Sequence, residues 1–181
     1  MEKKRLIVIG AGAAGMLAAG RAASLLQKTA DVVVLEKNEK PGRKIVITGK
    51  GRCNVTNAVS IENPTDRAFT SNIITGGRFL YSALSRFGAA ELMALLENEG
   101  VPLKIERGNR VFPVSDSSYD IVDGLKRYMQ RAGVQLKTGK SVVSLQKAGA
   151  RFAGHCENGN EEADAVILAT GGLSYPVTGS T

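Results

Sequence analysis

Cysteine, histidine and aromatic residues are scarce in this sequence of 181 residues. Its two cysteines, Cys53 and Cys156, lie far apart, and its one histidine is His155. This excludes a CxxC dithiol and leaves no usual spacing of zinc ligands. With no tryptophan, four tyrosines and five phenylalanines, few rings are available to stack on single-stranded nucleic acid. We therefore predict no metal site and expect a reducing, cytoplasmic environment.

Long apolar runs are also missing, since none reaches the roughly 20 residues of a transmembrane helix. The basic residues Lys3-Lys4-Arg5 stand before an apolar stretch and so imitate a secretion signal. That stretch continues into a glycine motif typical of a folded βαβ unit, which is the better interpretation. We expect no membrane partner.

Acidic residues are outnumbered, with 17 Asp and Glu against 24 Lys and Arg, for a formal charge of +7. The excess favours anionic ligands. Because the basic residues are scattered, we do not expect nucleic acid as a partner. The composition, 43% hydrophobic and 23% charged, is ordinary for a globular protein, and the length suffices for one sizeable core. We predict one main domain over residues 1–181.

The most informative segment is 6–36, which has the pattern of an apolar strand, a glycine-rich turn, an Ala/Leu-rich helix and a second apolar strand. Gly10 permits the tight turn, Gly12 lets backbone N–H groups approach a pyrophosphate, and Gly15 lets the helix pack on the strand. Glu36 follows 21 residues after Gly15. A carboxylate there accepts hydrogen bonds from a ribose and repels a 2′-phosphate. The segment predicts a site for the ADP half of FAD or NAD.

Three loops are expected to meet at the carboxyl edge of a parallel sheet, namely 10–15, 37–57 and 170–181. Glycines in the middle loop permit close backbone approach, and its cations could neutralise a pyrophosphate. It is not a Walker P-loop, because Gly49-Lys50 is followed by glycine where that motif requires Ser or Thr. An ordinary solvated basic loop is the alternative interpretation.

The remaining pattern predicts an α/β fold with a parallel sheet and an antiparallel meander. Helical periodicity runs from Arg78 to Glu99 and from about Ser118 to Ala132. Short strands are expected at 103–105 and 110–112 around a Gly108-Asn109 turn, at 134–136, 141–146 and 151–156 in the meander, and at 165–169 as a parallel strand buried on both faces.

Two side chains in the predicted loops could take part in chemistry. Neighbouring cations would lower the pKa of the Cys53 thiol, but no histidine stands near it, so a packed or cofactor-lining cysteine is preferred. Tyr175 could donate a proton, although an ordinary loop tyrosine is the preferred interpretation. No residue is assigned as catalytic.

Three stretches, Gly42–Asn57, Arg110–Asp116 and Ala169–Thr181, resemble the BaiN-like (YhiN-type) NAD(P)/FAD-dependent flavoproteins. The resemblance implies a glutathione-reductase-like FAD-binding Rossmann domain, with FAD as cofactor and NAD(P)H as electron donor. Members of that family are longer. The resemblance therefore covers their amino-terminal portion and implies a domain truncated before an inserted substrate domain and a carboxyl-terminal FAD segment.

The same resemblance, together with the glycine motif, implies a set of cofactor-binding residues. They are Gly10, Gly12, Ala13, Ala14, Gly15, Glu36, Lys37, Arg43, Lys44, Thr48, Gly49, Gly51, Arg52, Cys53, Asn54, Val142, Thr170, Gly171 and Gly172. By this resemblance, Arg43, Lys44 and the 48–54 loop would line the pyrophosphate and the flavin. Residues 170–172 would form a second FAD segment, and Val142 would contact the adenine through its backbone.

The leading functional hypothesis is a flavoprotein oxidoreductase that passes a hydride from NAD(P)H through flavin to a small organic acceptor such as an enone. One alternative is a non-catalytic nucleotide-binding fragment or module. A second is an FAD-dependent RNA-modifying enzyme, motivated by the charge of +7. The sequence assigns neither NADH nor NADPH as donor, nor an oligomeric state.

Overall fold

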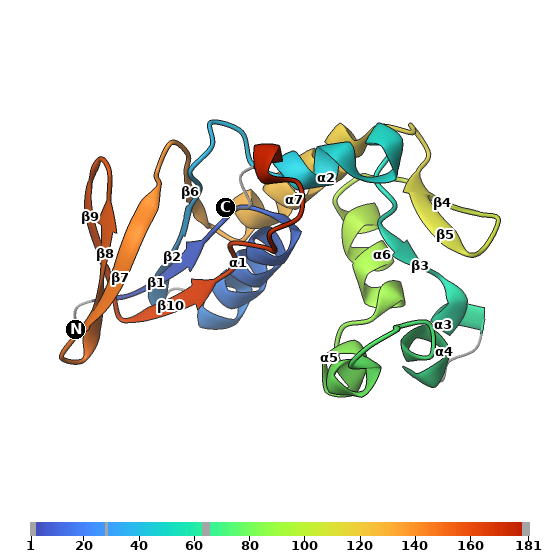
Figure 1. Cartoon of the computed structure of the whole chain (residues 1–181), viewed down its shortest axis with the longest axis horizontal. Coiled ribbons are helices and arrows are strands. Elements are labelled where there is room, and N and C mark those ends of the chain that lie inside the picture. Colours follow the sequence, from blue (N-terminus) through green and yellow to red (C-terminus); the bar gives the residue numbers. More distant parts are fainter. Residues whose placement is uncertain (1–2, 28, 63–65, 179–181) are drawn as a thin grey trace. The chain divides into compact units, whose positions relative to one another are not determined.

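The computed structural model describes residues 3–27, 29–62 and 66–178, which fall into two compact units (Figure 1). Unit 1 comprises Met1–Ile45 and Leu125–Thr181, and unit 2 comprises Val46–Gly124. The assignment of residues 1–181 to one cofactor-binding domain stays a prediction.

Unit 1 is built on a parallel four-stranded sheet with the order β10-β1-β2-β6. The strands are β1 (Lys4–Ile9), β2 (Ala30–Leu35), β6 (Gln135–Lys137) and β10 (Ala165–Leu168). Helix α1 (Ala13–Leu26) connects β1 to β2, as the sequence predicts. The predicted parallel arrangement of the first, second and last strands is confirmed, with Val8 opposite both Val34 and Ile167.

Apolar residues on both faces of β1 and β2 make the core of unit 1. Successive residues of a strand point to opposite faces. On one face, Ile7, Ile9, Val33 and Leu35 pack with the partly buried Val142. Each fully buried side chain of this size contributes about 1.5–3 kcal/mol.

The other face lies on the side of α1, because that helix contacts both strands. Val8 and Val34 are wholly removed from solvent, as is Met16 of the helix. Burial on both faces explains why these two strands are almost continuously apolar in sequence.

An antiparallel meander of β7 (Val142–Ala148), β8 (Arg151–Cys156) and β9 (Gly159–Ala163) adjoins this sheet. The prediction of a meander is confirmed, but its membership is corrected. The strand expected at 134–136 is β6, which pairs with β2 in the parallel sheet. Strand β9 takes its place, and the Asn158-Gly159 turn leads into β9 before the chain reaches β10.

The expectation that the last strand is buried on both faces is wrong. Within the described residues β10 pairs with β1 alone and forms an edge of the sheet. Its side chains are half-buried or exposed, and Leu168 is 67% exposed.

The long helix predicted from about Ser118 is confirmed as α7 (Ser118–Arg131). Its apolar stripe is buried at Ile121, Val122, Leu125 and Met129. The helix begins in unit 2 and ends in unit 1. In unit 1, a Cβ atom on Gly20 of α1 would lie 2.2 Å from the ring of Tyr128 of α7, so glycine permits these two helices to pack closely.

Unit 2 joins short helices to a three-stranded antiparallel sheet with the order β3-β5-β4. Helix α2 (Arg43–Ile47) follows β2, and its first residues belong to unit 1. The elements after it are η1 (Thr48–Gly51), β3 (Thr56–Asn57), α3 (Val59–Glu62), α4 (Asp66–Thr70), η2 (Gly77–Leu80), α5 (Tyr81–Leu84), α6 (Ala89–Asn98), β4 (Leu103–Glu106) and β5 (Arg110–Pro113). The two short strands predicted around Gly108-Asn109 are confirmed as β4 and β5. In unit 1, η3 (Pro176–Thr178) ends the described chain.

The continuous helix predicted from Arg78 to Glu99 is broken into η2, α5 and α6. Gly88 has extended backbone angles at the start of α6, and its N–H donates to Glu91 Oε2 at 2.8 Å. The break is a helix start that the apolar periodicity hides, because apolar residues continue on both sides of Gly88. Within the described residues no single helix has the length and apolar composition to cross a membrane. The pair Gly77–Leu84 and Ala89–Asn98, bent by 48° at the break, meets that test when taken together.

Candidate nucleotide-binding site

The turn between β1 and α1 is compact because its glycines leave no room for side chains. Gly10 has a φ of +101°, and a Cβ atom there would lie 2.5 Å from the Ala169 carbonyl oxygen. A Cβ atom on Gly15 would lie 1.9 Å from the carbonyl oxygen of Gly10. The helix therefore starts directly against the end of β1 and beside the end of β10.

The first turn of α1 is open to ligands. A Cβ atom on Gly12 would meet no heavy atom within 4 Å, and Ala13 and Ala14 are exposed. No acidic residue occupies this turn. The first N–H groups of a helix lack partners within the helix and carry its positive dipole end, which attracts phosphate. The open space at Gly12 therefore suits a pyrophosphate.

Glu36 is buried directly after β2, with 7% of its surface exposed. Its Oε2 accepts a hydrogen bond from the Ala11 N–H at 2.7 Å. Its Oε1 accepts from the backbone and the side-chain amide of Asn38, at 2.9 and 2.6 Å. These bonds fix the carboxylate beside the glycine turn, where the sequence predicts a ribose.

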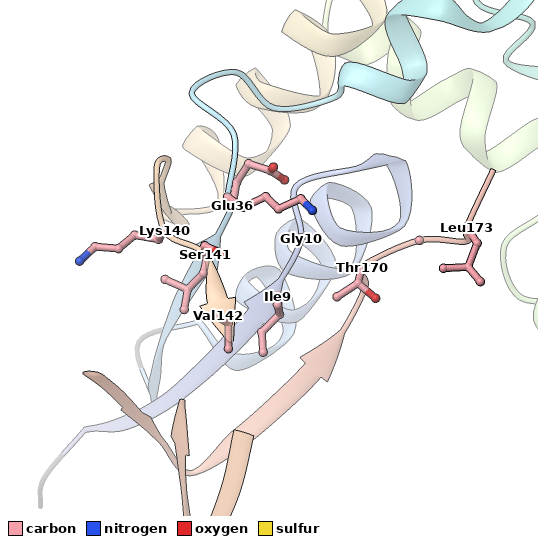
Figure 2. Close-up of a pocket in the computed structure, with 11 residues that line it drawn as sticks. Ile9, Gly10, Glu36, Lys140, Ser141, Val142, Thr170 and Leu173 are labelled. Carbon is pink, nitrogen blue, oxygen red and sulfur yellow. The ribbon is translucent and has the colours of Figure 1, made fainter. Parts of the chain in front are cut away.

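A cavity of about 300 Å³ opens at this edge of the sheet (Figure 2). This volume is at the lower end of ordinary small-molecule sites. In Figure 2, Glu36, Ser141 and Val142 lie to one side of Ile9 and Gly10, and Thr170 and Leu173 lie to the other. The lining residues are Ile9, Gly10, Leu35, Glu36, Lys37, Lys140, Ser141, Val142, Thr170, Gly171 and Leu173.

Two predicted cations bind neighbouring segments of unit 1. Arg43 Nη1 donates to Asn38 Oδ1 at 2.8 Å. Lys44 Nζ donates to the Gly172 carbonyl oxygen at 3.1 Å and to Ser174 Oγ at 3.5 Å. The N–H of Gly42 donates to the Ala11 carbonyl oxygen at 2.9 Å. The loops after β1, β2 and β10 therefore meet as predicted, although residues 179–181 of the last loop lie outside the described residues.

The predicted residues of the 48–54 loop belong to unit 2. Thr48, Gly49, Gly51 and Asn54 are exposed there. Arg52 pairs with Glu106 and Asp116 and lies over the Phe112 ring, 4.1 Å from its centroid. The hydrogen bond from Arg52 lowers the pKa of Glu106. The charge of Arg52 is thus compensated within unit 2, and its contact with a cofactor stays a prediction.

Cys53 is packed and not activated. It is 6% exposed, and burial raises the pKa of its thiol, while a hydrogen bond with Thr48 acts in the opposite direction. The expectation that nearby cations lower this pKa is wrong, because the thiol is buried and its loss of solvation raises the pKa. The structure shows a packed cysteine, and contact of Cys53 with a cofactor stays a prediction.

The family described as HI0933-like protein Rossmann domain matches residues 4–181. The chain belongs to the HI0933-like family. The predicted resemblance is confirmed, and so is the α/β Rossmann fold class with a parallel sheet and a meander.

Two curated relatives align with nearly the whole of this HI0933-like chain. A 3-dehydro-bile acid Δ(4,6)-reductase of Clostridium scindens is 33% identical over 97% of the chain and 41% of its own length. A ribosomal RNA dihydrouridine synthase of Escherichia coli is 31% identical over 100% of the chain and 42% of its own length. The chain thus spans about two fifths of the length of these relatives.

A solved structure shares the fold at lower identity. The 3-ketosteroid-Δ4-(5α)-dehydrogenase of Rhodococcus jostii matches with a TM-score of 0.67 and 18% identity, over 97% of this HI0933-like chain and 48% of its own chain.

Six residues at the site of this HI0933-like chain are missing from the predicted set, and two of them, Ile9 and Leu35, are the last residues of β1 and β2. Lys140, Ser141 and Leu173 line the cavity, and Asn38 binds the Glu36 carboxylate. Lys140, Ser141 and Leu173 are sequence neighbours of the predicted Val142 and Gly172, so extending those predictions by one or two residues finds them. Asn38 carries no motif signal.

Proposed function

We propose that this chain binds the ADP half of FAD and forms the cofactor-binding part of a flavin-dependent oxidoreductase. The observation that carries the proposal is the pairing of a buried, oriented Glu36 carboxylate with the open first turn of α1. Glu36 and Gly10 line the cavity, and the Ala11 N–H, just before that turn, donates to the carboxylate. A ribose hydroxyl needs an acceptor and a pyrophosphate needs backbone donors, and the two lie side by side at this edge.

Named residues would hold each part of the cofactor. The first N–H groups of α1, at Ala13 and Ala14, would donate to the pyrophosphate. Glu36 would accept from the ribose, and Ser141 and Val142 would flank the adenine. The loop at Thr170 and Gly171 would close the opposite wall. When bound, FAD would supply hydride-transfer chemistry that protein side chains lack.

The acceptor class follows from the two relatives. A Δ(4,6)-reductase and a dihydrouridine synthase are both named for adding two hydrogens across a carbon–carbon double bond. In the substrates that these two names indicate, the double bond is conjugated to a carbonyl group. We propose a conjugated enone or enamide as acceptor and NAD(P)H as donor. One turnover consumes one hydride from NAD(P)H and one proton, and yields NAD(P)⁺ and the saturated product.

The second candidate function is uridine reduction in RNA. It is favoured by two relatives named ribosomal RNA dihydrouridine synthase, from Escherichia coli and Haemophilus influenzae, and by the formal charge of +7. From the sequence alone, nucleic acid is not expected as a partner. A small enone and a uridine base present the same reactive group, so the two candidates share one cofactor site and differ in substrate.

Ligand titration tests the cofactor site. The purified chain is titrated with FAD, ADP and FMN in a calorimeter, and we expect ADP to compete with FAD while FMN, which lacks the ADP half, does not. Glu36→Gln should weaken ADP binding by about tenfold or more, because a hydrogen bond to a charged group is lost. Glu97→Gln, an exposed change on α6, is the matched control. Equal competition by FMN would contradict the proposal.

Anaerobic turnover separates the candidate functions. Oxidation of NADH or NADPH is followed with FAD present, using an α,β-unsaturated ketone or a uridine-containing ribosomal RNA transcript as acceptor. Salt-sensitive reduction of the transcript alone would favour RNA modification. FAD binding without oxidation of either donor would identify a non-catalytic binding module.

A further inference from the structure

We propose that Asn38 is a positioning residue that holds the Glu36 carboxylate ready for the ribose and couples it to Arg43. The inference rests on the proposed function and deepens it. Asn38 is half-buried, two residues after Glu36 in the loop that follows β2.

Asn38 joins three segments at the edge of the sheet. Its backbone N–H and its Nδ2 both donate to Glu36 Oε1, at 2.9 and 2.6 Å. Its Oδ1 accepts from Arg43 at 2.8 Å, and its carbonyl oxygen accepts from the Gly139 N–H at 3.3 Å. Gly139 directly precedes Lys140 and Ser141, which line the cavity. Asn38 thus connects Glu36, the start of α2 and the loop that leads into Ser141 and Val142, which we assign to the adenine.

A side-chain amide is the group that suits both neighbours. The carboxylate requires a donor and the guanidinium requires an acceptor, and an amide presents one of each in fixed geometry. The orientation with Nδ2 toward Glu36 is therefore determined by chemistry, since the flipped amide would oppose oxygen to oxygen. Aspartate has the same shape but would bring a second negative charge to Glu36.

This arrangement leaves Glu36 partly free to accept. A carboxylate offers about four acceptor directions, and among residues 3–27, 29–62 and 66–178 three are used, by Ala11 and Asn38. The fourth is on Oε2, the oxygen bonded to Ala11 in the glycine turn. A ligand hydroxyl that reaches this oxygen meets a carboxylate that needs no rearrangement.

Other charged groups around this carboxylate are engaged elsewhere or lie at the cavity wall. Lys140 Nζ donates to the Asn158 carbonyl oxygen at 2.6 Å, and its side chain points away from Glu36 in Figure 2. Lys137 pairs with Glu161 at 2.7 Å. Lys37 lines the cavity. The carboxylate of Glu39 lies beside Gly139, where a Cβ atom would be 3.1 Å from Glu39 Oε1. Among the hydrogen bonds of the Glu36 side chain described above, those from Asn38 are the ones that link it to a cation.

The test compares ADP affinity of wild type, Asn38→Asp and Asn38→Ala between pH 5 and pH 8 at constant ionic strength, by calorimetry. Because all three proteins bind the same ligand, titration of ADP itself cancels in the ratio of Kd values. We expect Asn38→Asp to bind about tenfold or more weakly at pH 8. The ratio should fall toward one as pH decreases, because protonation of the introduced carboxyl group removes the added charge and restores a donor beside Glu36.

Asn38→Ala should bind more weakly at every pH, with no recovery in acid, because it removes the amide without adding a carboxyl group. Asn98→Asp, an exposed change on α6 that adds the same charge, should leave the ratio at one. A ratio for Asn38→Asp near one throughout, or a loss that does not change with pH, would overturn the inference.

Failure of the proposed function and failure of the role of Asn38 give different results. Wild type that does not bind ADP refutes the proposed function, whereas wild type that binds ADP with a flat Asn38→Asp ratio refutes only the role of Asn38. If Asn38→Asp does not fold, unchanged ADP affinity in Asn38→Ala overturns the inference by itself.

Discussion

Single atoms decide what the glycine turn tolerates. Gly12 and Gly15 belong to one motif, yet an added Cβ atom meets empty space at the first and the carbonyl oxygen of Gly10 at the second. A methyl group therefore tests two different properties at positions three residues apart. The first position concerns the ligand, and the second concerns the fold.

Gly15→Ala should destabilise the protein by about 1–3 kcal/mol, because overpacking at 1.9 Å forces the backbone to shift. Gly12→Ala should leave stability within about 0.5 kcal/mol but weaken ADP binding, since its methyl group enters the open space that we assign to pyrophosphate. Urea unfolding and calorimetric titration measure the two effects. Equal loss of stability in both variants would show that Gly12 is also a packing residue.

Glu161 is a buried carboxylate held by two cations from other strands. Arg5 of β1 pairs with it, and Lys137 of β6 donates to it at 2.7 Å. Burial opposes its ionisation, but the hydrogen bonds from Lys137 and Arg5 outweigh burial, and its pKa is lowered. A carboxyl group with a lowered pKa stabilises the folded state above its unfolded pKa, and this stability is lost as pH falls through the folded value.

We expect the free energy of unfolding to fall as the medium is acidified below about pH 4.3, the ordinary pKa of glutamate. Glu161→Gln should reduce stability at pH 7 by about 1–2 kcal/mol and flatten this acid dependence. Glu162→Gln, which changes the exposed neighbour paired with Arg151, should cost under about 1 kcal/mol. Chemical denaturation between pH 3 and pH 7 measures both. A Glu161→Gln profile that matches wild type would contradict the role of the two cations.

Among elements, the loop after β10 depends on the start of α2. Lys44 Nζ donates to Gly172 and Ser174, so the wall formed by Thr170 and Gly171 is tied to the loop that follows β2. The family resemblance instead assigns Lys44 to the pyrophosphate and flavin side. The two roles differ in which ligands they affect.

Lys44→Met should weaken the binding of adenosine and of ADP by a similar factor, about threefold to tenfold. The reason is the loss of a hydrogen bond that holds the loop after β10 in place. Direct contact of Lys44 with phosphate predicts a loss for ADP alone. Lys147→Met on β7, an exposed change of the same type, is the control. Calorimetry with both ligands decides, and a loss confined to ADP would favour the original assignment.

At the scale of the whole molecule, the parts predictable from sequence are those whose contacts are local. The Gly10 turn, α1 and Glu36 interact within about thirty residues, and each has a residue type that its place requires. Strand β6 is wrongly predicted in the meander because its partner, Val33–Leu35, lies a hundred residues earlier and leaves no local signal. Strand β9 is not predicted because its buried Glu161 gives no apolar signal, and the cations that pair with it, Arg5 and Lys137, come from distant strands.

The candidate site divides in the same way. Glycines and Glu36 follow a known spacing, whereas Asn38 is a common loop residue whose importance comes from what its amide contacts. The break at Gly88 is hidden because apolar periodicity continues across it, and a hydrogen bond from its N–H to Glu91, not hydrophobicity, starts α6. Periodicity locates buried faces, but polar partners brought together by the fold must be seen in three dimensions.

The strand order in the sheet of unit 1 also determines when that sheet can be completed during synthesis. Val8 pairs with Val34 on one side and with Ile167 on the other, so β1 acquires its two neighbours at very different times. At about 5–20 residues per second, a ribosome needs on the order of ten seconds to travel from β2 to β10. We expect nascent β1 to keep one edge open during that interval, so chains stalled before β10 should depend more on chaperones than chains stalled after it.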